Sequence, residues 1–453
     1  MTAALSLGAQ TVYIQGYAHG GEGKKILVKT FDDYISGKEM SLASALIDSN
    51  GYFSVNFPLD ETIYAWFEVE YYVGEMYLEP GTHHKFTLNG LVFNDVTDKI
   101  NGNLEQMLID VVPDTGDMLN QKIRLFNQMS NRVLIAHMDN LLGRPFNRAL
   151  DSLQKVCDSM FSDNKHEYFT SYIRYRLASF YLMNLQSSSN GLFFRYLYHQ
   201  PVLYSNIEYM SFFGQYYENY FSVVNRPFGV DDLRHMVNTG ATFPALLDSL
   251  GADTLLQNEV LREMVLLESL KNILSGQGYK RSSVERLLTG FAGTSKFEIH
   301  RKIAANILEM ANRFEPGEKA VDFSLSSSTD DTVHLSDFRG KMVYIHFFTT
   351  WNTASLAEME VMRKLHTKYS QSIQFISICC DREYMKMYHF ARDTRFPWPV
   401  VHFNNDYTLL ESMGVKTYPY FMLIDGNGCY IENAAESPSG NIEGRFNKLL
   451  GVE

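Results

Sequence analysis

Residues 342–369 contain two successive patterns that few folds can accommodate. Met342–Phe348 is a run rich in β-branched and aromatic residues and has the length of a strand, which is typical of a buried central strand. Asn352, a favoured helix N-cap residue, follows shortly after this run. Beyond it, apolar residues recur at helical spacing: Leu356, Met359, Met362 and Leu365. The sequence therefore predicts a buried strand followed by a helix that begins near Asn352.

Further strand and helix patterns follow toward the C-terminus. Ile373–Ile378 predicts a second buried strand, and residues 382–392 predict a second helix. Gly414–Gly428 contains an apolar segment that enters a glycine-bearing turn, which predicts a strand leading into a hairpin. Upstream, Leu335–Lys341 leads directly into the first strand.

The order and spacing of individual residues in this region match a known pattern. The pattern is L-x-D-F-x-G-K, a strand, W-C-x-x-C-x-x-E-M-P, a strand, V-x-x-x-P and L-I-D-x-x-G. The matching residues are Leu335–Lys341, Trp351, Glu358-Met359, Pro419 and Ile424-Asp425. The region therefore resembles the TlpA and ResA type of bacterial extracytoplasmic thioredoxin-fold protein, within the AhpC/TSA and thioredoxin superfamily. The resemblance implies a thioredoxin-like α/β domain over residues 315–453.

The departures from the pattern fall mainly on its chemistry. Asn352 and Ser355 occupy the two cysteine positions, and Glu360 occupies the position of the proline. Dithiol exchange requires a thiolate, which an asparagine cannot form and a serine hydroxyl cannot replace. Asn352 keeps the helix cap but lacks the nucleophile. The sequence therefore predicts a degenerate, non-catalytic domain with no catalytic residue at Asn352 or Ser355.

The chain contains four cysteines outside the motif: Cys157, Cys379, Cys380 and Cys429. The strand order implied by the resemblance puts two strands between Cys379-Cys380 and Cys429. This separation is about 14 Å, whereas a disulfide needs Cα atoms within about 7 Å. Cys379-Cys380 remains either a buried structural pair or a redox pair. An oxidoreductase of altered design, using Cys379 and Cys380 or a cysteine of a partner, is therefore the alternative function.

The resemblance also implies a binding surface. In the family, the proline at the position of Pro419 is cis and faces the helix that bears the motif. Trp351, Asn352, Thr353, Tyr418 and Pro419 would then outline the groove in which relatives hold a partner polypeptide. We therefore expect an extracytoplasmic protein or peptide as the partner. A third possibility is that the thioredoxin-like domain is only structural and that the preceding domains carry the function.

Residues 10–94 are rich in strand patterns separated by turn signals. Thr11–Gly16, Ile26–Thr30, Phe53–Phe57 and Tyr64–Val69 alternate or run apolar, without intervening helical patterns. They predict a β-sandwich. The segment resembles the β-domain of unknown function that often precedes TlpA-like modules. Adjacent strand residues point to opposite faces, so His83-His84 does not predict a metal site, and we expect no cofactor or metal.

Residues 95–314 are helical by period. A stripe of aromatic residues at spacings of three and four is predicted to lie on one helix, either as a docking face or as buried core: Tyr209, Phe212, Phe213, Tyr216, Tyr217, Tyr220 and Phe221. Burial against neighbouring helices is the favoured interpretation. Glu315–Glu318 then ends the helical period. The whole chain is predicted to be a multidomain α+β protein with a β-sandwich, a helical middle and a thioredoxin-like α/β domain.

Charge and hydropathy restrict the partners. The formal net charge of −12 and pI of about 5.6 argue against a nucleic-acid partner, which would ordinarily contact a basic face. No stretch approaches 18 uninterrupted apolar residues, so no transmembrane segment is predicted in the chain as given. Ala3–Gln10 resembles the end of a signal peptide. Together with the family resemblance, this favours a periplasmic or otherwise extracytoplasmic, envelope-associated protein.

Overall fold

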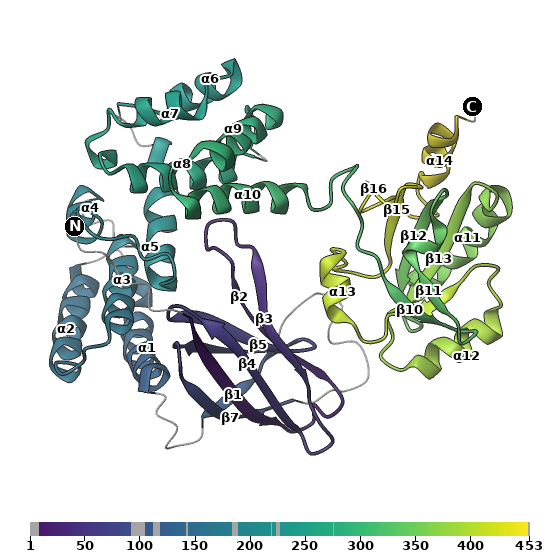
Figure 1. The fold of residues 1–453 in the computed structure, drawn as a ribbon, viewed down its shortest axis with the longest axis horizontal. Coiled ribbons are helices and arrows are strands. Elements are labelled where there is room, and N and C mark those ends of the chain that lie inside the picture. Colours follow the sequence, from purple (N-terminus) through teal and green to yellow (C-terminus); the bar gives the residue numbers. More distant parts are fainter. Residues whose placement is uncertain are drawn as a thin grey trace. The chain divides into compact units, whose positions relative to one another are not determined.

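The computed structural model describes residues 9–91, 105–111, 118–141, 144–183, 189–218, 220–222, 227–274 and 276–451. Contacts divide the chain into two compact units, one that reaches Met310 and one that runs from Ala311 and also includes Glu70–Tyr72 and the described residues Glu105 and Gln106 (Figure 1). Most of the predicted signal-peptide remnant lies outside the described residues.

Two β-sheets form the N-terminal region of the chain. One has the strand order β4-β1-β7-β9 and the other the order β3-β2-β5-β6-β8. The strands are β1 (Gln10–Ala18), β2 (Lys25–Phe31), β3 (Glu39–Leu46), β4 (Tyr52–Leu59), β5 (Ile63–Val69), β6 (Tyr72–Leu78), β7 (His83–Asn89), β8 (Glu105–Gln106) and β9 (Leu108–Val111). The two-sheet architecture predicted for the N-terminal region is therefore confirmed.

Alternation of side chains builds the core of this region. In β1 and β4, buried and exposed residues alternate, so that one face of their sheet is apolar. Gly16 in β1 leaves room for this packing, because a Cβ atom there would lie 2.5 Å from the Phe86 carbonyl oxygen. β9 pairs with β7, so strand pairing continues beyond residue 94. The domain boundaries at residues 94 and 314 stay predictions.

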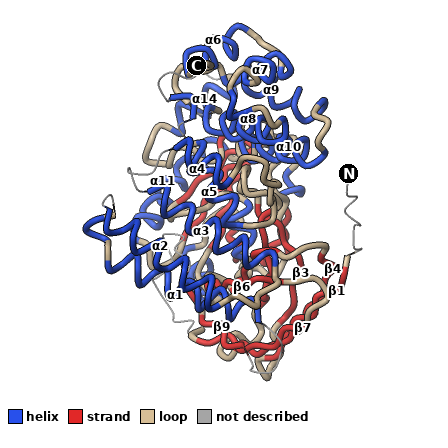
Figure 2. Tube along the Cα trace, turned by 90° about the vertical axis from the view of Figure 1, so that its left-hand side faces the viewer, coloured by secondary structure: helices blue, strands red, loops and turns tan. Residues whose placement is uncertain are grey.

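Helices follow the sheets along the chain. Figure 2 shows α1, α2 and α3 as neighbouring helices. The helices are α1 (Met118–Ala136), α2 (Arg144–Met160), α3 (Glu167–Met183), α4 (Ser189–Tyr196), α5 (Ile207–Tyr217), α6 (Val230–Thr239), α7 (Phe243–Leu250), α8 (Glu259–Ile273), α9 (Arg281–Thr294) and α10 (Glu298–Asn312). None of the helices in the described part of the chain is both long and apolar enough to cross a membrane.

The aromatic stripe is buried, as predicted. Each of its seven side chains is at most 8% exposed. The stripe does not lie on one helix, however, because α5 ends at Tyr217 and Tyr220–Ser222 forms a separate 3₁₀ turn, η2. Tyr220 and Phe221 therefore join the core from a different element, where the Tyr220 hydroxyl donates to Asp253 at 2.7 Å. The stripe is core and not a docking face.

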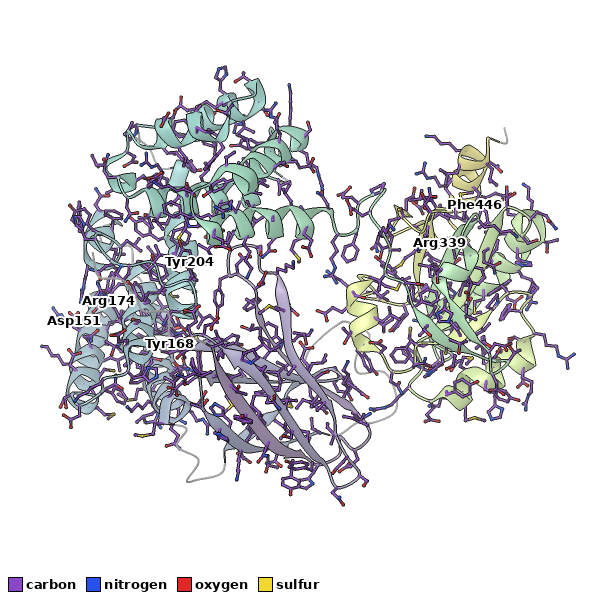
Figure 3. All side chains as sticks on the ribbon, in the orientation of Figure 1. Asp151, Tyr168, Arg174, Tyr204, Arg339 and Phe446 are labelled. Atoms are coloured by element: carbon purple, nitrogen blue, oxygen red, sulfur yellow. The ribbon has the colours of Figure 1, made fainter. Side chains whose placement is uncertain are left out.

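A buried polar network joins the loop before α5 to α8 and α10. The Tyr204 hydroxyl lies 2.7 Å from His300 Nε2, and His300 Nδ1 lies 2.7 Å from Glu263 Oε2. Ser295 Oγ donates to the same carboxylate oxygen at 2.6 Å. His300 and Glu263 are almost fully buried. Each polar group of the network has a hydrogen-bond partner, so none of them is buried without one. The network also holds the loop that carries Tyr204 (Figure 3).

The second unit is built on a seven-stranded sheet of order β11-β10-β14-β13-β12-β15-β16. Its strands are β10 (Ser324–Ser327), β11 (Thr332–His334), β12 (Met342–Phe348), β13 (Ile373–Cys379), β14 (Val400–His402), β15 (Tyr420–Ile424) and β16 (Tyr430–Glu432). Its helices are α11 (Thr353–Tyr369), α12 (Tyr384–Thr394), α13 (Tyr407–Ser412) and α14 (Ile442–Leu450). β12 runs parallel to β13 and antiparallel to β15.

Both faces of this sheet are covered by apolar side chains. Alternate residues of β12 enter two different cores: Val343, Ile345 and Phe347 pack with α13, and Tyr344 and Phe348 pack with α11, α12 and α14. β12 is thus the buried central strand that the sequence predicts. The predicted second helix is shifted along the chain, since α12 runs from Tyr384 to Thr394 rather than over 382–392.

Candidate functional site

The site lies where β12 ends and α11 begins. Asn352 is the N-cap residue of α11, and its side-chain oxygen accepts a hydrogen bond from the Ser355 backbone N–H at 3.0 Å. This bond satisfies one of the N–H groups that the first helical turn leaves without an intrahelical partner. The helix cap predicted from the sequence is therefore confirmed.

Asn352 also contacts a distant segment. Its side-chain Nδ2 donates a hydrogen bond to the Tyr418 carbonyl oxygen at 3.1 Å. The Tyr418–Pro419 peptide bond is cis, as the family resemblance implies. Since Pro419 precedes β15, a neighbour of β12, the sheet order brings this loop beside the start of α11. One side chain therefore joins the helix N-terminus to the cis-proline loop.

The five predicted binding residues differ in their surroundings. Trp351 and Pro419 are half-buried, and Thr353 is exposed at the first turn of α11. Tyr418 is half-buried, packs against the core on the α13 face of the sheet, and interacts through its hydroxyl with the Cys380 thiol. The structure thus joins Asn352 to Tyr418, while the Tyr418 ring belongs to the packing around Cys380. Their role in binding stays a prediction.

Asp381 supports the loop before the motif and was not predicted from the sequence. Its carboxylate accepts a hydrogen bond from the Thr350 backbone N–H at 2.8 Å and one from Cys379 Sγ at 3.1 Å. Its carbonyl oxygen lies 2.6 Å from His402 Nε2. Asp381 is only 4% exposed. The sequence contained one signal for a role of Asp381. It is a polar residue that follows a buried strand closely, at the carboxyl end of two parallel strands, where functional sites commonly lie.

Three polar side chains within a few residues of the motif are buried. They lack hydrogen-bond partners among the described residues. They are His346 in β12, Thr349 after it, and Ser355 in α11. His346 is fully buried, and its ring stacks on Phe421 with ring centroids 4.7 Å apart. Desolvation lowers the pKa of His346 to about 3. The imidazole is therefore neutral at physiological pH and adds no charge beneath the motif.

Cys379 and Cys380 are poorly suited to form thiolates. Burial is the main reason that the pKa of Cys379 lies well above its usual range, and Asp381 raises it further. Burial also raises the pKa of Cys380 to about 12, although the nearby Tyr418 hydroxyl acts in the opposite direction. β13 and β16 are separated by β12 and β15, which confirms the predicted separation of Cys379 from Cys429. All four cysteines are free.

Glu358 has a structural partner. Its carboxylate accepts hydrogen bonds from the Ser439 backbone N–H at 2.8 Å and from the Ser439 hydroxyl. The side chain therefore holds the turn before α14.

In the first unit, His83 is exposed and stacks on Tyr13, whereas His84 is buried, so the two rings face opposite sides of β7. Within the described residues, no three His, Cys, Asp or Glu side chains converge as metal ligands.

The central sheet, the helix that begins directly after β12 and the cis-proline loop beside it define a thioredoxin-fold domain. The AhpC/TSA family model matches residues 316–430. Thiol-disulfide oxidoreductase ResA of Geobacillus thermodenitrificans is 30% identical over 127 residues, which cover 28% of this chain and 72% of that protein. Through this domain, the chain belongs to the ResA-like thiol-disulfide oxidoreductase family within the AhpC/TSA family.

Other proteins are similar to about a third of the chain. Thioredoxin-like protein YneN of Bacillus subtilis is 25% identical over 149 residues, covering 31% of this chain and 80% of that protein. The crystal structure of the thioredoxin domain of a thiol-disulfide oxidoreductase from Bacteroides vulgatus is 19% identical, with a TM-score of 0.27. It matches 29% of this chain and 96% of that one.

Proposed function

We propose that this protein is a non-catalytic thioredoxin-fold protein of the cell envelope that binds an extracytoplasmic polypeptide. The binding surface, here called the motif face, consists of Trp351, Asn352, Thr353, Tyr418 and Pro419. The observation that carries the proposal is the double hydrogen bonding of Asn352, to the Ser355 N–H and to the Tyr418 carbonyl oxygen. The residue at the first cysteine position thus stabilises the frame of the site in place of providing a nucleophile.

Several features of the motif face suit a polypeptide partner. Trp351 is partly accessible, and tryptophan is enriched among residues that dominate binding energies at interfaces. The Tyr418 carbonyl oxygen has two lone pairs, of which Asn352 Nδ2 uses one. The second lone pair is available to a backbone N–H of an extended segment. The envelope location rests on the family resemblance.

The motif lacks sulfur, and Cys379 and Cys380 do not supply a reactive substitute. A thiol with a pKa near 12, as at Cys380, is almost entirely protonated at neutral pH, and the thiolate is the form that attacks disulfides. Cys379 is fully buried, and its Sγ donates to Asp381. These observations favour the binding function over the oxidoreductase of altered design.

The test of the binding function uses the full chain as bait against solubilised envelope proteins, with crosslinking before capture. Trp351→Glu and Thr353→Glu place charges on the motif face, and we expect each to reduce partner recovery by about tenfold, which corresponds to one hot-spot side chain. Thr367→Glu is the matched control, because Thr367 is an exposed threonine farther along the same helix. An unchanged set of partners in both motif-face variants would refute the proposal.

The redox alternative has a separate test. The full chain is incubated with insulin and a reductant, and precipitation of the insulin B chain is followed over time. We expect the uncatalysed rate from the unmodified protein, from Cys379→Ala and from Cys380→Ala. Catalysed turnover that disappears in either cysteine variant would establish the oxidoreductase function instead.

A further inference from the structure

A cavity of 570 Å³ lies in the helical part of the first unit, far along the sequence from the motif face. It is formed by the C-terminal half of α2 with the turn after it, by α3, and by the end of α4. Its volume falls within the range of about 300–1,000 Å³ that is usual for small-molecule sites. Cys157 and Phe169 give it a buried apolar floor.

Two arginines line the cavity beside one tyrosine ring. The Arg174 guanidinium carbon lies 5.8 Å from the Tyr196 ring centroid, and that of Arg195 lies 5.1 Å from it. Arg174 is held in place, because Nη2 donates to the Arg195 carbonyl oxygen at 2.7 Å and Nη1 donates to Gln200 at 3.1 Å. Contact with the Tyr196 ring orients both guanidiniums, and the two hydrogen bonds further restrict that of Arg174.

The carboxylates near these arginines have other partners. Asp158, which lines the cavity, accepts a hydrogen bond from Gln154 at 2.7 Å. Asp151 accepts a hydrogen bond from the Tyr181 hydroxyl at 2.6 Å. The hydrogen bonds of Arg174 in the described structure go to neutral oxygens, those of Gln200 and the Arg195 backbone. The lining therefore carries two guanidiniums and one carboxylate, that of Asp158, and its net positive charge favours an anion.

Part of the remaining wall is apolar, and the rest carries the polar side chains of Gln154, Ser162, Asn164 and Thr170 and the carboxylate of Asp158. Phe161 and Phe169 meet edge to face with centroids 4.9 Å apart, and Ile173 lies beside them on α3. Burial also raises the pKa of the Cys157 thiol to about 11, so this side chain contributes apolar surface rather than a thiolate. The cavity therefore combines two guanidiniums with apolar surface from Phe161, Phe169 and Ile173, which suits a ligand of mixed character.

We propose that the cavity between α2, α3 and α4 binds a small organic carboxylate, with the carboxylate at Arg174 and Arg195 and its apolar body against Phe161 and Phe169. Figure 3 shows Asp151 and Arg174, which mark the α2 and α3 sides of this region. A guanidinium donates two parallel hydrogen bonds to a carboxylate, which fixes the orientation of the ligand as well as its charge. The site gives the helical region a binding function that is independent of the motif face.

Isothermal titration calorimetry of the full chain with phenylacetate tests the proposal. Phenylacetamide serves as the neutral analogue of the same shape, and acetate as the analogue without an apolar body. We expect phenylacetate to bind, and both analogues to bind at least about tenfold more weakly, because each lacks one of the two recognised features. Equal binding of acetate and phenylacetate would overturn the assigned ligand class.

Variants locate the binding. Arg195 is exposed and its side chain makes no hydrogen bond that holds the fold together in the described structure, so Arg195→Gln tests charge without unfolding the helices. We expect it to weaken phenylacetate binding about tenfold, and Phe161→Ala to weaken it by a similar factor. Arg124→Gln, at an exposed arginine of α1, is the control and should leave binding unchanged. No measurable binding of phenylacetate at millimolar concentration, or binding unaffected by Arg195→Gln and Phe161→Ala, would refute the proposal.

Discussion

The side-chain amide of Asn352 hydrogen-bonds to the Tyr418 carbonyl oxygen at 3.1 Å, and its oxygen caps α11 through the Ser355 N–H. In relatives that follow the full pattern, a cysteine stands at this position. A cysteine thiol is a weak hydrogen-bond donor and acceptor, whereas an amide provides a strong donor and a strong acceptor in a fixed geometry. The substitution of cysteine by asparagine therefore removes reactivity and adds a structural link between two loops.

Substitutions at Asn352 should separate these two hydrogen bonds. Asn352→Ala removes both, and we expect a loss of about 1–2 kcal/mol in local stability at the start of α11. Asn352→Asp keeps an oxygen that accepts from the Ser355 N–H but loses the donor to Tyr418. Amide hydrogen exchange of residues 353–356 reports on the bond to Ser355, and exchange of residues 418–421 reports on the bond to Tyr418. Faster exchange only around 418–421 is expected for Asn352→Asp. Equal exchange in all three proteins would show that neither bond matters.

Restoring both cysteines should restore redox chemistry if the frame is intact. In Asn352→Cys/Ser355→Cys, the first thiol lies at the N-terminus of α11, where backbone N–H groups and the helix dipole favour a thiolate. We expect a reversible disulfide and insulin reduction at least about tenfold above background. Asn352→Cys and Ser355→Cys alone are the controls and should lack turnover. A double variant that forms no disulfide would show that the frame around the motif has changed.

The buried His346 predicts a specific response to acid. Its folded-state pKa of about 3 lies below the ordinary value of 6.5, so the unfolded chain binds one more proton than the folded chain between these pH values. Above pH 6.5 the histidine is neutral in both states, so its titration does not change the free energy of unfolding. As the pH falls from 6.5 toward 3, the free energy of unfolding of the domain decreases by about 1.4 kcal/mol per pH unit.

His346→Phe should reduce this acid sensitivity. The phenyl ring keeps the stacking on Phe421 and removes two ring nitrogens that lack hydrogen-bond partners in the described structure. We expect unchanged or higher stability at pH 7, and a smaller decline between pH 6 and pH 4, measured by hydrogen exchange of β12 amides. His389→Gln, at an exposed histidine of α12, is the control. The same acid slope in His346→Phe and the unmodified protein would contradict the assignment.

The buried network of Tyr204, His300 and Glu263 should be sensitive to loss of one hydroxyl. Tyr204→Phe leaves His300 Nε2 without its partner in a fully buried position, which costs about 1–3 kcal/mol. Thermal unfolding of the full chain, followed by calorimetry, measures this loss. Tyr198→Phe removes a hydroxyl from an exposed tyrosine and should change stability by less than about 0.5 kcal/mol. Identical transitions for the two variants would argue against a stabilising network.

The local elements were largely predictable. The spacing of Met359, Met362 and Leu365 predicts the buried face of α11, and Asn352 predicts its start. β3 was not predicted, because Glu39–Leu46 consists largely of small and polar residues and lies at the edge of its sheet, where little of it is buried. The aromatic stripe was predicted as core, but its division between α5 and η2 was not.

The sequence by itself determined the strand-to-helix unit, the helix cap and the absence of a thiol at Asn352 and Ser355, because these depend on residue type and on near neighbours in the chain. Only the tertiary structure decided that Asn352 binds the Tyr418 carbonyl, that Asp381 supports the motif loop, and that two arginines share one cavity. Such contacts join residues far apart in the chain. They depend on the order of strands and the packing of helices, which residue spacing alone does not specify.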